Sequence, residues 1–143
     1  MHRRLSYRPL THLVTVCRRG NVLDVPLTGS FDTILCLSVT KWVHLNWGDD
    51  GLKRLFSRAF DLLVPGGLLI VEPQPWKSYS AAFHKQKMPD ETRVHYRNVA
   101  LRPAEFAEHL HSVVGFARVE QLREGAQTGF DRPLLVCYKP TAV

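Results

Sequence analysis

Short apolar runs alternate with a longer amphipathic segment along the first half of the chain. Residues 13–17, 32–38 and 68–71 are rich in aliphatic side chains and have the length of buried strands. Between the second and third runs, apolar residues recur at helical spacing over residues 50–63, which predicts a helix. Because strands that alternate with helices build a mainly parallel sheet between helical layers, we expect a three-layer α/β domain.

The second half of the chain predicts shorter elements. Residues 77–86 are expected to form a helix, and Pro103 suits the first turn of another helix that runs to about residue 111. Residues 87–101 between them are polar and mixed, and a short strand near Val99 is one interpretation. The last two expected strands, 117–122 and 134–138, are joined by a polar loop instead of a helix, so they are expected to pair antiparallel.

The carboxyl end of the strand at residues 32–38 is the first candidate for a functional site. In open α/β sheets, ligands bind at the carboxyl ends of strands. Alternatively, the tryptophans that follow this strand could be core anchors and the polar side chains could form caps and turns. The number of functional groups at this one strand end favours a site. The apolar run changes abruptly there to polar and aromatic side chains: Ser38, Thr40, Lys41, Trp42, His44, Asn46 and Trp47.

The next strand end carries a second polar group of residues. The strand at residues 68–71 is followed by Glu72-Pro73-Gln74-Pro75-Trp76, and the two prolines make this segment rigid. Glu72 and Gln74 would lie beside the first strand end in such a sheet. Positioning a substrate and forming hydrogen bonds within the loop are equally good interpretations of these two side chains.

Size, charge and cysteine content narrow the function only a little. A chain of 143 residues suits one domain, and a net charge of +6 is compatible with an acidic partner such as nucleic acid. The three cysteines show no CxxC spacing and no histidine at ligand spacing, so we expect reduced thiols and no metal site. No apolar run could span a membrane and no secretory signal is evident, which favours a cytoplasmic or nuclear protein.

The sequence as a whole resembles the methylphosphate capping enzymes, which are RNA methyltransferases of the Bicoid-interacting type. The segments that carry this resemblance are LCLSVTKWVHLNWGDDGLKRLF, PGGLLIVEPQPWKSY, LRPAEF and GFDRPLLVCYK. They imply a partial methyltransferase domain over residues 11–143, after a basic arm at residues 1–10. The family methylates the terminal phosphate at the 5′ end of a small non-coding RNA with S-adenosyl-L-methionine. A nuclear location and protein partners of a ribonucleoprotein are expected on the same basis.

The resemblance also implies roles for individual residues on the cofactor side. Leu37 matches the leucine that the family places against the cofactor at its LCLS strand end. Asn21 and Val22 match the segment that contacts the adenine, although this chain lacks the aromatic residue of that segment. These three residues are the predicted cofactor contacts.

Lys41, Trp42 and His44 match the family residues beside the RNA 5′ end. Methyl transfer to a phosphate oxygen needs no strong base, because the nucleophile is already an anion, but it needs the two groups held in line. Lys41 can hold the phosphate as a point charge, so Lys41 and His44 are the predicted catalytic residues. The tryptophans can stack a base or a sugar. The predicted substrate contacts are Trp42, Glu72, Gln74 and Trp76.

Two features of a class I methyltransferase are not visible in the sequence. The chain contains no Gly-x-Gly for the turn after the first strand, and no acidic residue follows a second strand to bind the ribose. The class I strand order places two further strands between those at residues 13–17 and 32–38. We therefore expect a Rossmann-like class I methyltransferase fold that is N-terminally incomplete. A non-catalytic remnant that binds RNA or a protein partner is the alternative function, and Arg93, Arg97 and Arg102 are weaker candidates for an RNA track.

Overall fold

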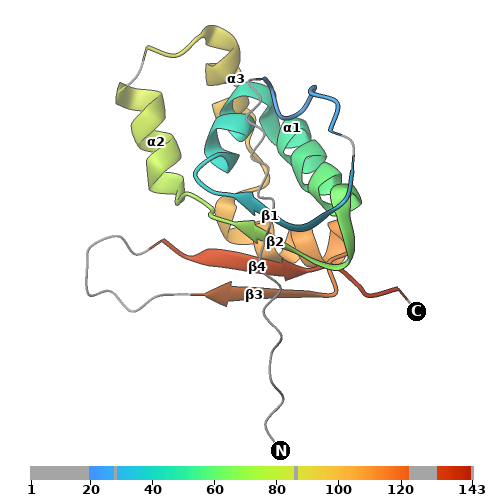
Figure 1. The fold of residues 1–143 in the computed structure, drawn as a ribbon. Coiled ribbons are helices and arrows are strands. Elements are labelled where there is room, and N and C mark those ends of the chain that lie inside the picture. The colour runs from blue at the N-terminus through green and yellow to red at the C-terminus, as the bar shows by residue number, and fades with distance from the viewer. Residues whose placement is uncertain (1–19, 28, 86, 123–131, 143) are drawn as a thin grey trace, which may run out of the picture.

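The computed structural model describes residues 20–27, 29–85, 87–122 and 132–142 (Figure 1). The predicted strand at residues 13–17, the predicted arm at residues 1–10 and most of the predicted loop before the last strand lie outside these residues. The elements are β1 (Phe31–Cys36), α1 (Thr40–Leu62), β2 (Leu63–Val71), α2 (Trp76–Lys85), α3 (Asp90–Asn98), η1 (Pro103–Glu105), α4 (Phe106–His109), η2 (Leu110–Val114), β3 (Arg118–Leu122) and β4 (Leu134–Tyr138).

The strands form one sheet in the order β1-β2-β4-β3. β1 and β2 are parallel, so the residues that follow each of them meet at the same edge of the sheet. β4 runs antiparallel to both β2 and β3. The predicted antiparallel pairing of the last two strands is therefore confirmed, and so is the mixed α/β class.

One face of the sheet carries the hydrophobic core. Cys36, Leu69 and Cys137 point to this face and pack with residues of α1, α4 and η2, including Phe56 and Phe106. The helices α1 and α4 contact each other directly, because the rings of Phe56 and Phe106 pack edge to face with their centres 5.5 Å apart.

The opposite face of β1 is more open. Leu35 alternates with the buried Cys36 and is 60% exposed. In the described ranges, no helix packs over this side of β1 (Figure 1). The third layer of the predicted architecture therefore stays a prediction. No described helix combines the length and the apolarity needed to cross a membrane.

The helix α1 begins ten residues earlier than the sequence predicts. Residues 40–47 were expected to be a polar segment after the strand, but they form the first turns of α1. Their buried positions follow helical spacing, and two of them carry the polar side chains of Thr40 and His44. Because these two buried side chains are polar, the hydrophobic pattern of the sequence does not indicate a helix over residues 40–47.

A kink at Gly48 divides α1 into two parts. Gly48 has φ 64° and ψ −168°, which is a conformation that glycine adopts without strain. His95 of α3 binds the backbone carbonyl oxygen of Leu45 at 3.1 Å through Nδ1, which satisfies an acceptor beside the interruption. The kink lets Asp49 turn toward the protein interior, where it takes part in the site described below.

Three other predicted elements differ from the structure. β2 begins at Leu63, before the Pro-Gly-Gly sequence, and its register with β1 shifts between Phe31 and Thr33. The short strand near Val99 is wrong, because a helix, α3, runs up to Asn98 and Val99 only caps it. The helix predicted from Pro103 to about residue 111 is a succession of 3-10, α and π turns that ends at Gly115, whose φ of 102° suits glycine.

Candidate active site

The ends of β1 and β2 bring together side chains that lie far apart in the sequence. The Ser38 hydroxyl donates to Oε2 of Glu72 at 3.0 Å, and Arg132 donates to Oε1 of Glu72 at 2.6 Å. Arg132 also donates to the Ser38 oxygen at 3.1 Å. Glu72 is only 8% exposed, whereas the Arg132 side chain is 37% exposed, so the carboxylate is shielded and the guanidinium reaches the surface. We call the group of Ser38, Lys41, Glu72, Gln74 and Arg132 the strand-tip site.

Gln74 fixes the start of α1. Its side-chain oxygen accepts hydrogen bonds from the Thr40 hydroxyl at 2.9 Å and from the backbone N–H of Lys41 at 3.0 Å. The helix has no side-chain cap of its own at Val39, so the amide of Gln74 supplies that function from the segment after β2. Gln74 is buried and positions Lys41. The prediction that it contacts substrate stays a prediction.

Lys41 is held in one orientation beside the Glu72–Arg132 pair. Its ammonium donates to the Ser78 hydroxyl at 2.9 Å and lies 4.5 Å from the centre of the Trp42 ring. Partial burial, together with the charge of Arg132, lowers the pKa of Lys41 from the usual lysine value. An ammonium carries three donors, and Ser78 takes one of them in the described structure. The remaining donors suit an anion.

The backbone at Ser38 is strained. Ser38 has φ 58°, and in the described residues it is the only residue other than glycine with a positive φ. A serine in this conformation costs free energy, and such strain is concentrated at functional sites. Here it turns the chain between β1 and α1 so that the Ser38 hydroxyl faces Glu72.

His44 is completely buried in a polar network. Its Nε2 lies 2.7 Å from Oδ1 of Asp49, and its Nδ1 lies 3.3 Å from the Tyr79 hydroxyl. The other oxygen of Asp49 accepts the backbone N–H groups of Ala100 and Leu101 at 3.1 and 3.0 Å. Both ring nitrogens of His44 are therefore occupied. His44 connects α1 to Tyr79 of α2, and Asp49 connects α1 to the segment before η1. This geometry gives His44 a positioning role, and its predicted catalytic role stays a prediction.

The pKa values of this pair shift in the same direction. Burial lowers the pKa of His44, and the hydrogen bond and charge of Asp49 only partly oppose that effect. Burial by itself would raise the pKa of Asp49, but the hydrogen bonds from His44, Leu101 and Ala100 lower it overall. The neutral imidazole with a proton on Nε2 fits both neighbours, since Nε2–H donates to Asp49 and Nδ1 accepts from the Tyr79 hydroxyl.

We expect the chain to lose stability as the pH falls below about 6.5. Because folding lowers the pKa of His44, the unfolded chain takes up a proton that the folded chain resists. The resulting stabilisation is present above the unfolded pKa and is lost as the pH falls towards the folded value. Asp49 adds a similar loss of stability only in stronger acid, at a pH below the ordinary aspartate pKa of 3.8, because folding lowers its pKa too. Urea unfolding at about pH 7.5 and about pH 5 measures the difference.

The matched variants for this measurement are His44→Gln and His84→Gln. Glutamine at position 44 can still donate to Asp49 but does not titrate, so the loss of unfolding free energy on acidification should shrink. His84 is exposed on α2, and its replacement should leave the pH dependence as it is. An unchanged pH dependence in His44→Gln would show that the buried pair does not cause it.

An aromatic column stands beside the strand-tip site. Trp76 stacks on Tyr96 with ring centres 5.1 Å apart and an angle of 7° between the planes. Tyr96 stacks in turn on Phe83 at 4.2 Å. The guanidinium of Arg102 lies over the Trp76 ring at 3.6 Å. Trp76 is thus part of a fixed stack, whereas Trp42 is 40% exposed at the start of α1.

Two of the predicted cofactor residues, Asn21 and Val22, lie in a turn beside β1, whereas Leu37 directly follows β1 at the same end as Ser38. The side chain of Asn21 is used within its own turn, because it donates to Asp24 at 2.6 Å and accepts from the N–H of Leu23 at 3.1 Å. Arg58 of α1 anchors this turn by donating to the carbonyl oxygens of Leu23 and Val25. The turn is therefore firmly attached to α1.

Val22 borders an apolar cleft of about 370 Å³ that runs between β1, α1 and the turn at residues 20–25. Leu35, Cys36 and Val39 line it as well, and Leu37 is 46% exposed beside it. These side chains suit the flat, apolar base of a nucleoside cofactor. The described residues supply no comparable set of polar partners here for a ribose or an amino acid end. The fit to S-adenosyl-L-methionine is thus partial.

Arg132 and Asp49 are the functional residues that sequence reasoning missed. Arg132 reaches Ser38, from which it is 94 residues distant along the chain, and only the pairing of β4 with β2 brings it there. In the sequence, Asp49 or Asp50 suits the cap of the helix predicted over residues 50–63, and nothing distinguishes Asp49 from its neighbour. No pattern in the sequence around Asp49 and Asp50 indicates a hydrogen bond to His44. Among the described residues, no group of His, Cys, Asp and Glu side chains is arranged to hold a metal ion.

Comparison with known proteins assigns this arrangement to a family. The model of the Bicoid-interacting protein 3 (Bin3) family matches residues 31–139, which include every member of the strand-tip site. The chain belongs to the Bin3 family. A probable RNA methyltransferase of Arabidopsis thaliana is 53% identical over 112 residues, which are 76% of this chain and 34% of that protein. The human 7SK snRNA methylphosphate capping enzyme is 47% identical over 116 residues, which are 78% of this chain and 16% of the human protein.

Solved structures support the same fold for this Bin3 family member. An O-methyltransferase family protein from Burkholderia thailandensis superposes with a TM-score of 0.52 at 16% identity, covering 80% of this chain and 32% of that one. The S-adenosylmethionine-dependent methyltransferase SibL gives a TM-score of 0.53 at 16% identity, covering 86% and 35%. The predicted class I methyltransferase fold is confirmed. The chain spans about a third of these structures, about a third of the Arabidopsis relative and 16% of the human relative.

Proposed function

We propose that this chain contributes the phosphate-binding half of an enzyme that methylates the 5′-terminal phosphate of a small non-coding RNA, with S-adenosyl-L-methionine as the methyl donor. The observation that carries the proposal is the fixed ammonium of Lys41, held between Ser78 and Trp42 beside Arg132. Two cations at the ends of parallel strands suit a phosphate, because fixed charges bind it without reorganising.

The chemistry of methyl transfer agrees with what these residues can do. The attacking phosphate oxygen is already charged, so no side chain has to remove a proton. His44 is buried with both ring nitrogens occupied, and the reaction has no need of it as a base. Lys41 and Arg132 orient the phosphate, while Glu72 holds Arg132 in place. The cofactor supplies an electrophilic methyl group, and the apolar side chains of Val22 and Leu37 suit its adenine end.

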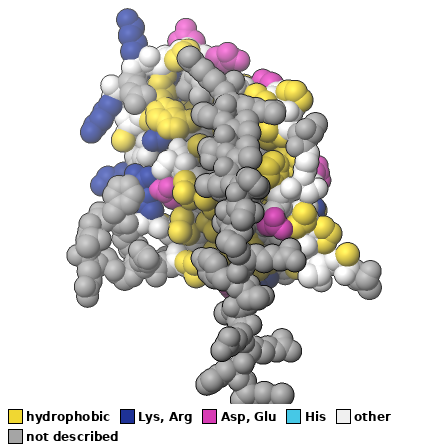
Figure 2. Space-filling view, viewed as in Figure 1, with side chains coloured by type: hydrophobic (Ala, Val, Ile, Leu, Met, Phe, Trp, Pro, Cys, Tyr) yellow, Lys and Arg dark blue, Asp and Glu magenta, His cyan; other side chains and the backbone are white. Residues whose placement is uncertain are grey.

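Small RNA is the substrate class that the relatives favour. The Drosophila melanogaster relative is named a U6 snRNA methylphosphate capping enzyme and is 44% identical over 112 residues. The Xenopus laevis relative is named a pre-miRNA 5′-monophosphate methyltransferase and is 33% identical over 139 residues. Basic surface supports the same reading, because Lys and Arg side chains gather over α2 and toward the start of β4 (Figure 2). These names favour an enzyme over the non-catalytic remnant.

A chimera tests the proposal without relying on a complete cofactor site in residues 1–143. Residues 31–139 replace the matching segment of the human 7SK snRNA methylphosphate capping enzyme. The chimera is incubated with methyl-labelled S-adenosyl-L-methionine and RNA that carries either a 5′-phosphate or a 5′-hydroxyl. We expect label on the 5′-phosphate of the first RNA and none on the second. A folded chimera that binds the cofactor and methylates neither RNA would contradict the proposal.

A further inference from the structure

A second cleft adjoins the strand-tip site. Its volume is about 840 Å³, and the residues that define it include Pro73, Pro75, Trp76, Arg102, Arg132 and Pro133. Arg132 belongs to both places, because it lines this cleft and donates to Glu72 and Ser38. A ligand bound at the strand-tip site can therefore extend into the cleft without leaving the protein surface.

Arg102 gives this cleft a fixed, flat cation. The guanidinium rests on the Trp76 ring at 3.6 Å, and Trp76 is itself held by stacking on Tyr96. The backbone of Arg102 is tied down as well, because its N–H donates to Oε2 of Glu105 at 2.8 Å. The Arg102 side chain is exposed to solvent at the mouth of the cleft, so it can meet a ligand.

The buried pair described above orients this arginine. Asp49 binds the N–H groups of Ala100 and Leu101, which directly precede Arg102. The network of His44, Asp49 and Tyr79 thus links the start of α1 to the position of the guanidinium.

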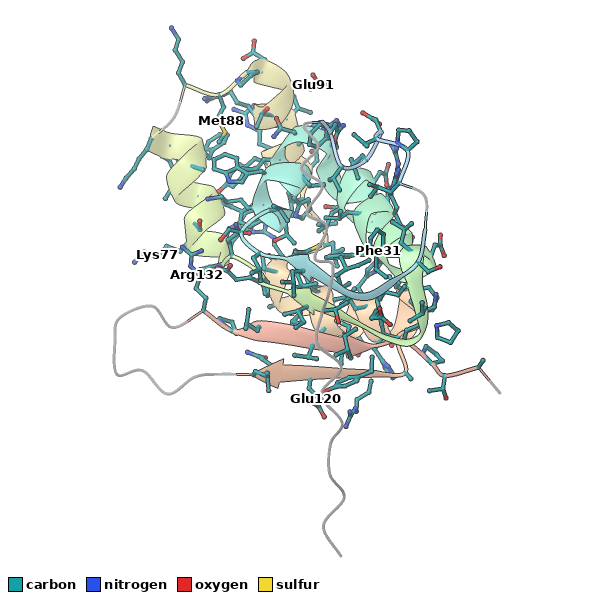
Figure 3. The ribbon with its side chains drawn as sticks, viewed as in Figure 1. Phe31, Lys77, Met88, Glu91, Glu120 and Arg132 are labelled. Atoms are coloured by element: carbon teal, nitrogen blue, oxygen red, sulfur yellow. The ribbon has the colours of Figure 1, made fainter. Side chains whose placement is uncertain are left out.

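The lining of the cleft matches one nucleotide of single-stranded RNA. Rigid proline rings provide apolar walls, and a guanidinium plane offers a stacking surface of the kind on which unpaired RNA bases rest. Two guanidiniums also favour the phosphodiester that leads into the cleft. Arg132 is partly neutralised by Glu72, so Arg102 carries most of this attraction. In Figure 3, Lys77 and Arg132 project from the same side of the molecule, at the start of α2 and before β4.

We infer that this cleft binds the base of the second nucleotide of the RNA, stacked on the guanidinium of Arg102, while the 5′-phosphate occupies the strand-tip site. The inference rests on the proposed function and adds a subsite to it. The terminal phosphate then identifies the end of the RNA, and the cleft requires that the next nucleotide be unpaired. Duplex ends with a paired second nucleotide would bind poorly.

Binding of short single-stranded RNA to residues 1–143, measured by fluorescence anisotropy, tests the subsite. Four RNAs are compared, with either a uracil or an abasic ribose at the second position and either a 5′-phosphate or a 5′-hydroxyl. A stacked base contributes roughly 5- to 150-fold in affinity, so the abasic RNA should bind more weakly by a factor in this range. The 5′-phosphate effect reports the proposed function, and the base effect reports the cleft.

Two variants locate the base effect. Arg102→Ala removes the stacking surface, and Ala104→Trp places a bulky ring in the cleft from an exposed position on its wall. Both should weaken binding of the uracil RNA. Ala104→Trp should leave binding of the abasic RNA nearly unchanged, whereas Arg102→Ala, which also removes a charge that attracts the phosphodiester, should weaken binding of the abasic RNA by a smaller factor than binding of the uracil RNA. Val113→Trp adds the same indole at a site that is 71% exposed outside the cleft lining and should change neither.

The outcomes separate the two ideas. A 5′-phosphate preference without any base effect would overturn the cleft assignment and leave the proposed function standing. A base effect that disappears in Ala104→Trp, without a 5′-phosphate preference, would support the cleft and argue against the proposed function. Equal affinity for all four RNAs, or no binding at all, would overturn both.

Discussion

Replacing Lys41 with alanine in the active chimera is expected to lower methyl transfer by roughly 10- to 100-fold. Hydrogen bonds to charged groups contribute about 1.5–3 kcal/mol, and Lys41 supplies such a bond to the phosphate in this account. The fold should survive, because the ammonium is half-buried and its one described hydrogen bond goes to the Ser78 hydroxyl. Initial rates at saturating cofactor, with RNA varied, measure the effect.

Two control variants show whether the effect belongs to this position. Lys53→Ala removes a lysine from the exposed side of α1 and should leave the rate unchanged. Lys41→Arg keeps the charge but changes its geometry, so it should retain part of the activity. If Lys41→Ala were as active as the parent chimera, Lys41 would not hold the phosphate.

We expect the affinity of residues 1–143 for S-adenosyl-L-methionine to be orders of magnitude lower than that of the chimera. The described part of the chain offers apolar contacts at Val22 and Leu37, while the Asn21 side chain is used within its own turn. The sequence contains no Gly-x-Gly, the motif of the turn that normally supports the methionine end. Several missing hydrogen bonds of about 1.5–3 kcal/mol each multiply to a large loss, since about 1.4 kcal/mol is tenfold in affinity.

Isothermal titration calorimetry of the two proteins with the cofactor measures this difference. The native chain and the chimera are compared at the same temperature and salt concentration, with S-adenosyl-L-homocysteine as a second ligand. Micromolar binding by residues 1–143, with steady turnover on a 5′-phosphorylated RNA, would contradict the expectation. It would mean that the chain builds a complete cofactor site from residues other than those predicted.

The convergence of the two strand ends could be predicted from the sequence. Two buried strands joined by a helix predict a parallel pair, and parallel neighbours end at the same edge of the sheet. For that reason Ser38, Lys41, Glu72 and Gln74 were placed together correctly, and the described hydrogen bonds join them. The antiparallel end of the sheet followed in the same way from a connection without a helix.

The remaining features depend on contacts that have no local signal. The start of α1 was missed because its buried face carries Thr40 and His44, whose polar groups are satisfied by Gln74, Tyr79 and Asp49 after folding. The helix α3 was missed because it is stabilised by aromatic stacking through Tyr96 instead of a stripe of aliphatic residues. Such long-range partners decide these elements, and periodicity cannot reveal them.

Recognition of a terminal phosphate by the strand-tip site can be measured in a single binding comparison. Residues 1–143 and their Lys41→Ala variant are titrated with the same single-stranded RNA carrying either a 5′-phosphate or a 5′-hydroxyl. We expect the native chain to bind the phosphorylated RNA more tightly, by about tenfold or more, and the variant to show little preference. Equal affinity of the native chain for the two RNAs would show that the strand-tip site does not recognise the phosphate.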